Sequence, residues 1–184
     1  MIESKIIYLL GIHHLVQWNN TLKITEEFID FLTTKIGSLH VDLIAEEFSE
    51  EAKSRNNINQ TTTEKVAEVL NIKHLLCDPS IVEREAIGYL TSQELREKFG
   101  SKSSFEGTDE FIKRKKFEKE FMWPIREKYW LDKIKNKSFK NIIFVCGCEH
   151  LESFKFMLEQ NNYSVLILEK QFLYESQLAN KKTG

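Results

Sequence analysis

Histidines follow glycines near both ends of the chain, each time directly after an apolar run. Residues 6–10 lead into the tetrapeptide GIHH, which ends at His14, and residues 142–146 lead into GCEH, which ends at His150. Apolar runs of β-branched and aromatic residues closed by glycine are typical of buried parallel strands. Imidazole changes charge near neutral pH and serves as a general base or a metal ligand. His14 and His150 are therefore the first candidate site residues.

Two adjacent carboxylates follow a third apolar run. Residues 40–45 are followed by Glu46 and Glu47, where another parallel strand would end. Two imidazoles and one carboxylate can hold a divalent ion such as zinc, manganese or cobalt, whose bound water becomes the nucleophile. Without a metal, Glu46 and His14 would remove a proton from water. Glu46 is favoured over Glu47 because it ends the alternating run, so the predicted metal ligands are His14, Glu46 and His150.

Each of these residues also has a simpler interpretation. A single histidine at a strand end is usually a solvated polar residue, and a glutamate there often begins a helix. The occurrence of the same strand, glycine and histidine pattern twice favours a functional site for His14 and His150.

An arginine lies on a helix predicted over residues 123–135, which begins with a proline tolerated in a first turn. Arg126 and Trp130 are four residues apart and share a face. That face is either an aromatic stripe packed on the core or an anion clamp, in which the guanidinium stabilises a developing oxyanion.

Other polar residues near the predicted strand ends are candidates for substrate contacts: His13, Glu47, Asp78 and Arg84. Glu149 is either an additional base or a charge that complements a helix N-terminus. The basic run at residues 113–116 is flanked by acidic residues and is interpreted as a solvated helix face.

The order of predicted elements indicates an α/β fold. Strands are expected over residues 5–10, 40–46, 74–77, 141–146 and 164–168. Helices are expected over residues 25–36, with Thr25 as cap, from residue 63, with Val69 facing inward, and over residues 82–85, 94–97, 123–135 and 151–160. Residues 49–60 and 100–104 are polar and indicate loops.

Length and composition fit one domain, residues 1–170, with a central parallel or mixed sheet, followed by a flexible tail at residues 171–184. Ligands of such sheets bind outside the carboxyl ends of the strands, so His14, Glu46 and His150 are expected in one cleft. The net charge of -2 argues against a nucleic-acid partner. Three cysteines and no long apolar segment indicate a reducing, cytoplasmic location with no membrane association.

The ordered set of motifs resembles the TraB/TIKI superfamily, which also includes erythromycin esterase-like, ChaN-like and TraB-PrgY-like proteins. The matching features are two GxxH motifs, a glutamate at the end of the second strand and an arginine on the helix before the last motif. Here these are the motifs ending at His14 and His150, Glu46 and Arg126, in an order that covers residues 5–168. The glutamate is doubled in this chain, which leaves Glu47 as an alternative.

The resemblance implies an α/β enzyme that hydrolyses a peptide, an ester or a similar acyl bond in a small-molecule or peptide substrate, with or without one divalent metal. ChaN-like proteins are associated with haem, which implies an alternative ligand-binding function with iron held by His13, His14 and Tyr129. A third alternative is an interaction protein that forms a homodimer through aromatic residues: Phe117, Phe121, Trp123 and Trp130.

Overall fold

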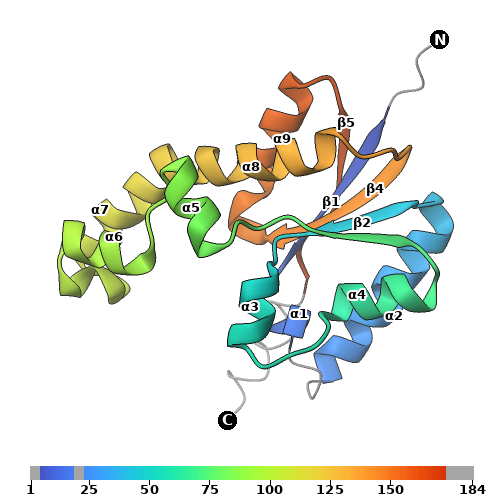
Figure 1. The fold of residues 1–184 in the computed structure, drawn as a ribbon, viewed down its shortest axis with the longest axis horizontal. Coiled ribbons are helices and arrows are strands. Elements are labelled where there is room, and N and C mark those ends of the chain that lie inside the picture. The colour runs from blue at the N-terminus through green and yellow to red at the C-terminus, as the bar shows by residue number, and fades with distance from the viewer. Residues whose placement is uncertain (1–4, 19–22, 173–184) are drawn as a thin grey trace.

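The computed structural model describes residues 5–18 and 23–172, which form a five-stranded sheet with helices on both faces (Figure 1). The strands are β1 (Ile6–Ile12), β2 (Leu43–Glu46), β3 (Lys73–Leu76), β4 (Asn141–Gly147) and β5 (Ser164–Phe172). The longer helices are α2 (Lys23–Leu39), α4 (Thr62–Val69), α6 (Ser92–Phe99), α7 (Asp109–Phe117), α8 (Trp123–Lys135) and α9 (Leu151–Gln160). The shorter ones are α1 (Leu15–Trp18), α3 (Glu50–Arg55), α5 (Ile81–Ile87), the 3-10 turns η1 (Ser101–Ser104) and η3 (Cys148–His150), and the π-helical turn η2 (Glu118–Met122).

The sheet has the order β3-β2-β4-β1-β5, and every neighbouring pair is parallel. The prediction of a single α/β domain is confirmed, and the sheet is wholly parallel rather than mixed. The two GxxH strands, β1 and β4, are neighbours at its centre. Their carboxyl ends therefore lie side by side, although the motifs are far apart in sequence.

Side chains of the central strands alternate between two cores, as the two-residue period of a strand requires. Ile7 and Leu9 pack with α8 and α9, whereas Tyr8 and Leu10 pack with α2 and α4. Because both faces are covered, the strands are apolar at nearly every position. The same alternation decides which polar side chains at the strand ends face which layer.

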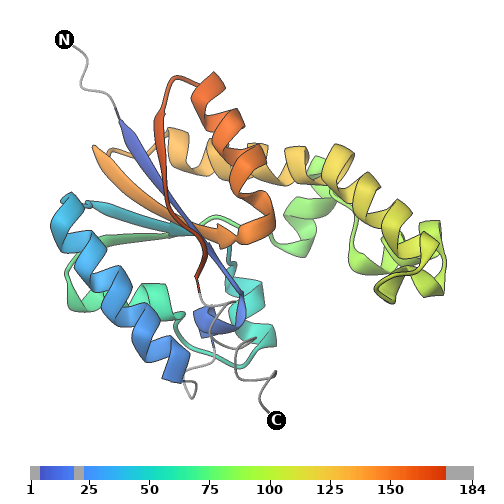
Figure 2. The same cartoon turned by 180° about the vertical axis from the view of Figure 1, so that it is seen from behind.

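The helices form two layers and one projecting arm (Figures 1 and 2). Helices α8 and α9 cover one face of the sheet, and α2 and α4 cover the other. Helices α6 and α7 extend away from the sheet, and the chain then returns through η2 into α8. A π-helical turn is frequent at functional sites, and η2 leads directly to Trp123 in the pocket described below.

Several boundaries differ from the predictions. Residues 49–60 are not wholly a loop, because Ser49 caps α3 by accepting a hydrogen bond from the backbone N–H of Ala52. Thr25 lies inside α2, which begins two residues earlier. Val69 does not face inward, since it is 83% exposed at the end of α4. Residues 101–104 form η1.

Strand β5 continues to Phe172, past the predicted end at residue 168, because residues as late as Phe172 still pair with β1. Most of the expected tail, residues 173–184, lies outside the described residues. In the part of the chain that the structure describes, no helix is both long and apolar enough to span a bilayer.

Candidate functional site

A pocket of about 530 Å³ opens at the carboxyl edge of the sheet. It lies where β1 and β4 end and where α8 begins, and Lys115 of α7, Tyr89 after α5, Glu118 of η2 and Gln171 of β5 also line it. The polar or charged residues singled out from the sequence that line it are His13, His14, Glu47, Arg126, Glu149 and His150. The two GxxH histidines thus share one pocket, as expected for motifs on adjacent parallel strands.

The two adjacent glutamates point to opposite sides of the sheet, because successive strand residues alternate. Glu47 points towards α8 and lines the pocket, and its side chain is 1% exposed. Glu46 points towards α4 and is fully buried. Its carboxylate accepts hydrogen bonds from Gln17 and Thr61 and lies 3.0 Å from His74 Nε2. The structure therefore places Glu47, rather than Glu46, on the pocket wall.

Glu47 is held by two close donors, and His14 lies nearby. The backbone N–H of Gly147 donates to Glu47 Oε2 at 2.7 Å. Arg126 Nη1 lies 2.5 Å from Glu47 Oε1, and His14 Nε2 lies 3.7 Å from the same oxygen. The last distance is too long for a hydrogen bond, so Glu47 does not accept a hydrogen bond from His14 Nε2.

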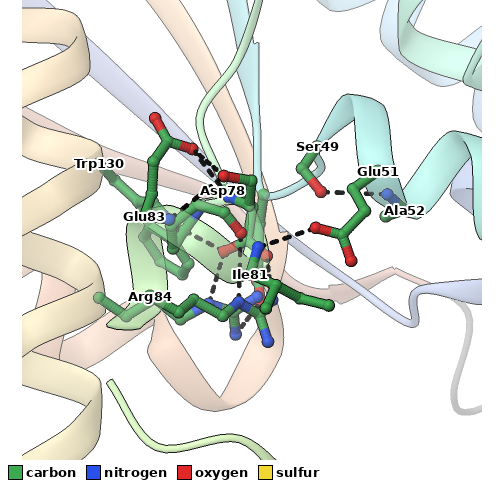
Figure 3. A network of polar contacts seen from close by, with 12 residues as sticks. Ser49, Glu51, Ala52, Asp78, Ile81, Glu83, Arg84 and Trp130 are labelled. Carbon is green, nitrogen blue, oxygen red and sulfur yellow. Dashed lines mark hydrogen bonds and ion pairs between the residues drawn. The ribbon is translucent and has the colours of Figure 1, made fainter. Parts of the chain in front are cut away.

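The Arg126 guanidinium is engaged by a second carboxylate as well as by Glu47. Arg126 Nε donates to Asp78 Oδ1 at 2.6 Å. Asp78 also accepts from Trp130 Nε1 at 3.3 Å and from Arg84 Nη2 at 2.8 Å, and Figure 3 shows these three side chains together. Asp78 and Arg84 thus do not line the pocket, and Asp78 instead holds Arg126, which does. Because the Arg126 fork already holds two carboxylates of the chain itself, its contacts favour a positioning function over a free anion clamp.

Figure 3 also shows how this corner is joined to the neighbouring helix. The Glu51 carboxylate accepts a hydrogen bond from the backbone N–H of Ile81 at 2.8 Å, which links α3 to the start of α5. Glu83 is the third residue of α5 and forms a capping box with the N-cap Ser80, and its carboxylate accepts from the Tyr129 hydroxyl. Tyr129 therefore bonds within this corner and is not part of the pocket lining.

The charges around Glu47 and Asp78 shift their pKa values downward. Burial alone would raise the pKa of Glu47, but the Arg126 guanidinium and the His14 and His150 imidazoles bring it below its ordinary value of 4.5. For Asp78, burial is likewise outweighed by Arg126 and Arg84, so its pKa lies below 3.8. Both groups are carboxylates at neutral pH.

These shifts predict acid sensitivity. A carboxyl whose pKa is depressed by folding stabilises the fold above its unfolded pKa, and this contribution is lost as the pH falls through the folded value. We therefore expect the free energy of unfolding to fall as the pH drops below about 4.5. Denaturant unfolding between pH 7 and pH 2.5 measures this. Glu47→Gln should flatten the acid limb, whereas Glu85→Gln, at an exposed position of α5, should not. A wild-type profile without an acid limb would contradict the assignment.

The imidazole of His14 is oriented by the helix that follows it, α1. Its Nδ1 lies 2.8 Å from Gln17 Oε1, one turn later in α1. The side chain is 51% exposed and lines the pocket, and its Nε2 lies beside Gly147. Its neighbour His13 is arranged differently, since the backbone N–H of Leu15 donates to His13 Nδ1 at 3.3 Å. An acceptor at Nδ1 places the ring proton of neutral His13 on Nε2.

His150 is held from behind by a buried carboxylate, Glu127, which was not among the site residues predicted from the sequence. His150 Nδ1 lies 2.8 Å from Glu127 Oε1, which also accepts from Ser153 Oγ at 2.6 Å. The ring lies between Trp123 and Trp130, with centroid distances of 4.6 and 5.0 Å. Glu127 was recognisable, because it occupies the same helix face as Trp130, Leu131 and Ile134, and a charge on an apolar stripe requires a partner.

The aromatic interface expected from the sequence is largely internal. Trp123 is 8% exposed and Trp130 is fully buried, since both pack on His150 within the chain. Phe121 is 55% exposed, and Phe117 packs between Phe99 and Phe121. The two tryptophans are therefore not available for a dimer contact.

The predicted metal ligands are not assembled as one set. His14 and His150 line the pocket, but Glu46 is held on the other face of the sheet. Among residues 5–18 and 23–172, no group of three or more His, Cys, Asp or Glu side chains is arranged to hold a metal ion. Cys148 also lines the pocket, but burial and Glu149 raise its pKa, so its thiol stays protonated at neutral pH.

Both motif glycines are required for space rather than for an unusual backbone conformation. Gly147 has φ -58°, which any residue can adopt. A Cβ added there would lie 2.9 Å from His14 Nε2 and 3.4 Å from Glu47 Oε2. A Cβ at Gly11 would lie 2.2 Å from the carbonyl oxygen of Lys170. Gly147 therefore leaves room for the His14 imidazole, and Gly11 leaves room for β5.

The fold and the pocket define a parallel α/β domain with a histidine-lined pocket at the carboxyl edge of its sheet. No family model and no curated protein matches the chain. A solved structure described as "Cofacial heme binding to ChaN of Campylobacter jejuni" aligns over 91% of this chain and 81% of its own length. The TM-score is 0.48 and the sequence identity is 15%. At this level the similarity concerns the fold alone.

Proposed function

We propose that the chain is a ligand-binding protein whose pocket takes haem, with His14 Nε2 as the ligand of the iron. The observation that supports this is a half-exposed imidazole whose Nδ1 is already engaged by Gln17, in an open pocket of about 530 Å³. A neutral imidazole with its proton on Nδ1 presents a lone pair at Nε2, which is the form that binds haem iron.

The other polar groups of the pocket suit haem iron less well. The Leu15 contact places the proton of neutral His13 on Nε2. His150 is 6% exposed between two tryptophans. Burial raises the pKa of Tyr89, which keeps the phenol protonated at neutral pH. His14 is therefore the proposed ligand, while Trp123 and Tyr89 supply aromatic surface for the macrocycle. Lys115 also lines the pocket, but its Nζ donates to Glu149 Oε2 at 2.9 Å, so binding a haem carboxylate there requires an exchange of this partner.

The test is titration of the purified chain with haemin, followed by the Soret absorption. We expect a shifted Soret band with the wild-type chain and a loss of affinity of about 100-fold or more in His14→Asn, since even weakening the support of a metal-ligating histidine costs 10–100-fold. His40→Asn is the matched control, because His40 is exposed and lies before β2, at the opposite edge of the sheet. Asparagine also tolerates the positive φ of 49° found there.

His13→Asn separates the two adjacent imidazoles. If His14 is the ligand, His13→Asn keeps the Soret shift and the affinity stays within a few-fold of wild type. Equal losses in His13→Asn and His14→Asn would contradict the assignment of the ligand. A wild-type chain that leaves the haemin spectrum unchanged would contradict the proposed function itself.

A second candidate function is hydrolysis of a peptide, ester or similar acyl bond, because the same Nε2 lone pair suits a general base. Here His14 would remove a proton from water, and Arg126 would hold Glu47 in place. Screening peptides and small esters with the wild-type chain and with His14→Asn tests this. Turnover that needs His14 in a chain that does not bind haemin would favour hydrolysis, and absence of turnover in the wild type would exclude these substrates.

A further inference from the structure

A buried glutamine connects the two sides of the sheet end. Gln17 of α1 is fully buried. Its Nε2 donates to Glu46 Oε2 at 2.8 Å, and its Oε1 lies 2.8 Å from His14 Nδ1. The amide therefore stands between a carboxylate that does not reach the pocket and an imidazole that does.

The carboxylate decides which way the amide is oriented. Gln17 Nε2 donates to a carboxylate oxygen, which accepts, so the NH₂ group of Gln17 faces Glu46. Thr61 Oγ1 donates to the other oxygen, Glu46 Oε1, at 2.5 Å, and His74 Nε2 lies 3.0 Å from it. With its NH₂ group engaged, Gln17 can present only its carbonyl oxygen to His14. That oxygen requires a proton on His14 Nδ1, which in the neutral ring leaves the lone pair on Nε2.

We propose that Gln17 is a positioning residue that sets the tautomer of His14, with Glu46 as the group that fixes its orientation. The consequence for ligand binding rests on the proposed function, but the tautomer itself does not. Glu46 thus acts on the pocket through Gln17, although Glu46 itself does not line the pocket. Partners behind a metal-binding histidine fix its tautomer and ring orientation in the same way.

The test is ¹⁵N NMR of the histidine rings in the wild-type chain and in Gln17→Met. Spectra at pH 8.5 report which nitrogen carries the proton of the neutral ring. We expect His14 to carry it on Nδ1 in the wild type and to distribute it between both nitrogens in Gln17→Met. The matched control is Thr62→Val. Thr62 Oγ1 donates to the backbone oxygen of Val16 at 2.7 Å and so holds the same turn of α1. Its hydroxyl is not part of the hydrogen-bonded series Glu46, Gln17 and His14.

Glu46→Gln provides a second variant that does not remove the buried amide. An amide at position 46 can accept or donate, so Gln17 is free to rotate and the His14 tautomer should again become mixed. Retention of the Nδ1 proton in both Gln17→Met and Glu46→Gln would overturn the proposal. So would an equal change in Thr62→Val, because loosening of α1 would then suffice.

Haemin titration of the same variants separates this proposal from the proposed function. We expect Gln17→Met to weaken haem binding by about 10–100-fold, the range for partners of a metal-ligating histidine. If the tautomer changes but no variant, including the wild type, binds haemin, the positioning inference stands and the haem proposal fails. If His14→Asn loses haemin while Gln17→Met leaves the tautomer and the affinity unchanged, the haem proposal stands and the positioning inference fails.

Discussion

Arg126→Leu is expected to lower the free energy of unfolding by about 3–5 kcal/mol at pH 7, the cost of removing one partner from a buried ion pair. The guanidinium bonds Asp78 at 2.6 Å and lies 2.5 Å from Glu47, and the two carboxylates are 6% and 1% exposed. Leucine would leave both buried charges without this cation. Denaturant unfolding measures the loss.

The pH dependence of Arg126→Leu distinguishes lost charge from lost packing. In acid both carboxyls are protonated and the cation stabilises neither, so the difference from wild type should shrink below about pH 4. The free energy of unfolding of Arg126→Lys should lie between those of the wild type and Arg126→Leu, because a single ammonium cannot reproduce a two-pronged contact. Arg55→Leu is the control, since Arg55 is 64% exposed and pairs with Glu51, and it should change stability by about 1 kcal/mol or less. An equal effect of both leucine variants would contradict this account.

Gly11→Ala should destabilise the chain by about 3 kcal/mol or more, the upper end of the range for overpacking. The new Cβ would lie 2.2 Å from the carbonyl oxygen of Lys170 and 2.6 Å from Leu151 Cδ1. The first of these atoms is backbone and cannot rotate away. The pairing of β1 with β5 is irregular here, between Leu10 and Ile12, and the close approach accompanies that irregularity.

Gly37→Ala is the matched control for this effect. Gly37 lies inside α2, and a Cβ there meets nothing within 4 Å. Alanine should therefore stabilise the chain by about 0.5–1 kcal/mol, because glycine is unfavourable in a helix interior. Denaturant unfolding of both variants gives the comparison. Opposite signs support steric exclusion at Gly11, and a tolerated alanine at Gly11 would refute it.

The parallel sheet was predictable because apolar strands covered on both faces produce a local pattern. The runs before Gly11 and Gly147 have this pattern, and both became central strands. Helix α3 was missed although its signals were present, with Ser49 as cap, acidic residues in the first turn and basic residues in the last. The many amides that follow α3 obscured these signals, which shows that composition is a weaker guide than capping chemistry.

The site was predictable by residue type but not by register. Glu46 and Glu47 differ only by the face of β2 to which they belong, and a shift of one residue reverses that face. Only the packed helices show that Glu47 meets Arg126 of α8 while Glu46 meets Thr61 at the start of α4. The sequence alone does not determine which of the two glutamates faces the pocket.

By itself, the sequence determined the α/β class, the two GxxH strands and the meeting of His14 and His150 at one edge, because these depend on local periodicity and on the shared direction of parallel strands. The tertiary structure decided the partners of these groups, namely Gln17 for His14 and Glu127 for His150. Buried polar side chains take whatever donor or acceptor the packed layers bring within about 3 Å. That proximity arises only when helices distant in sequence are fixed against the sheet.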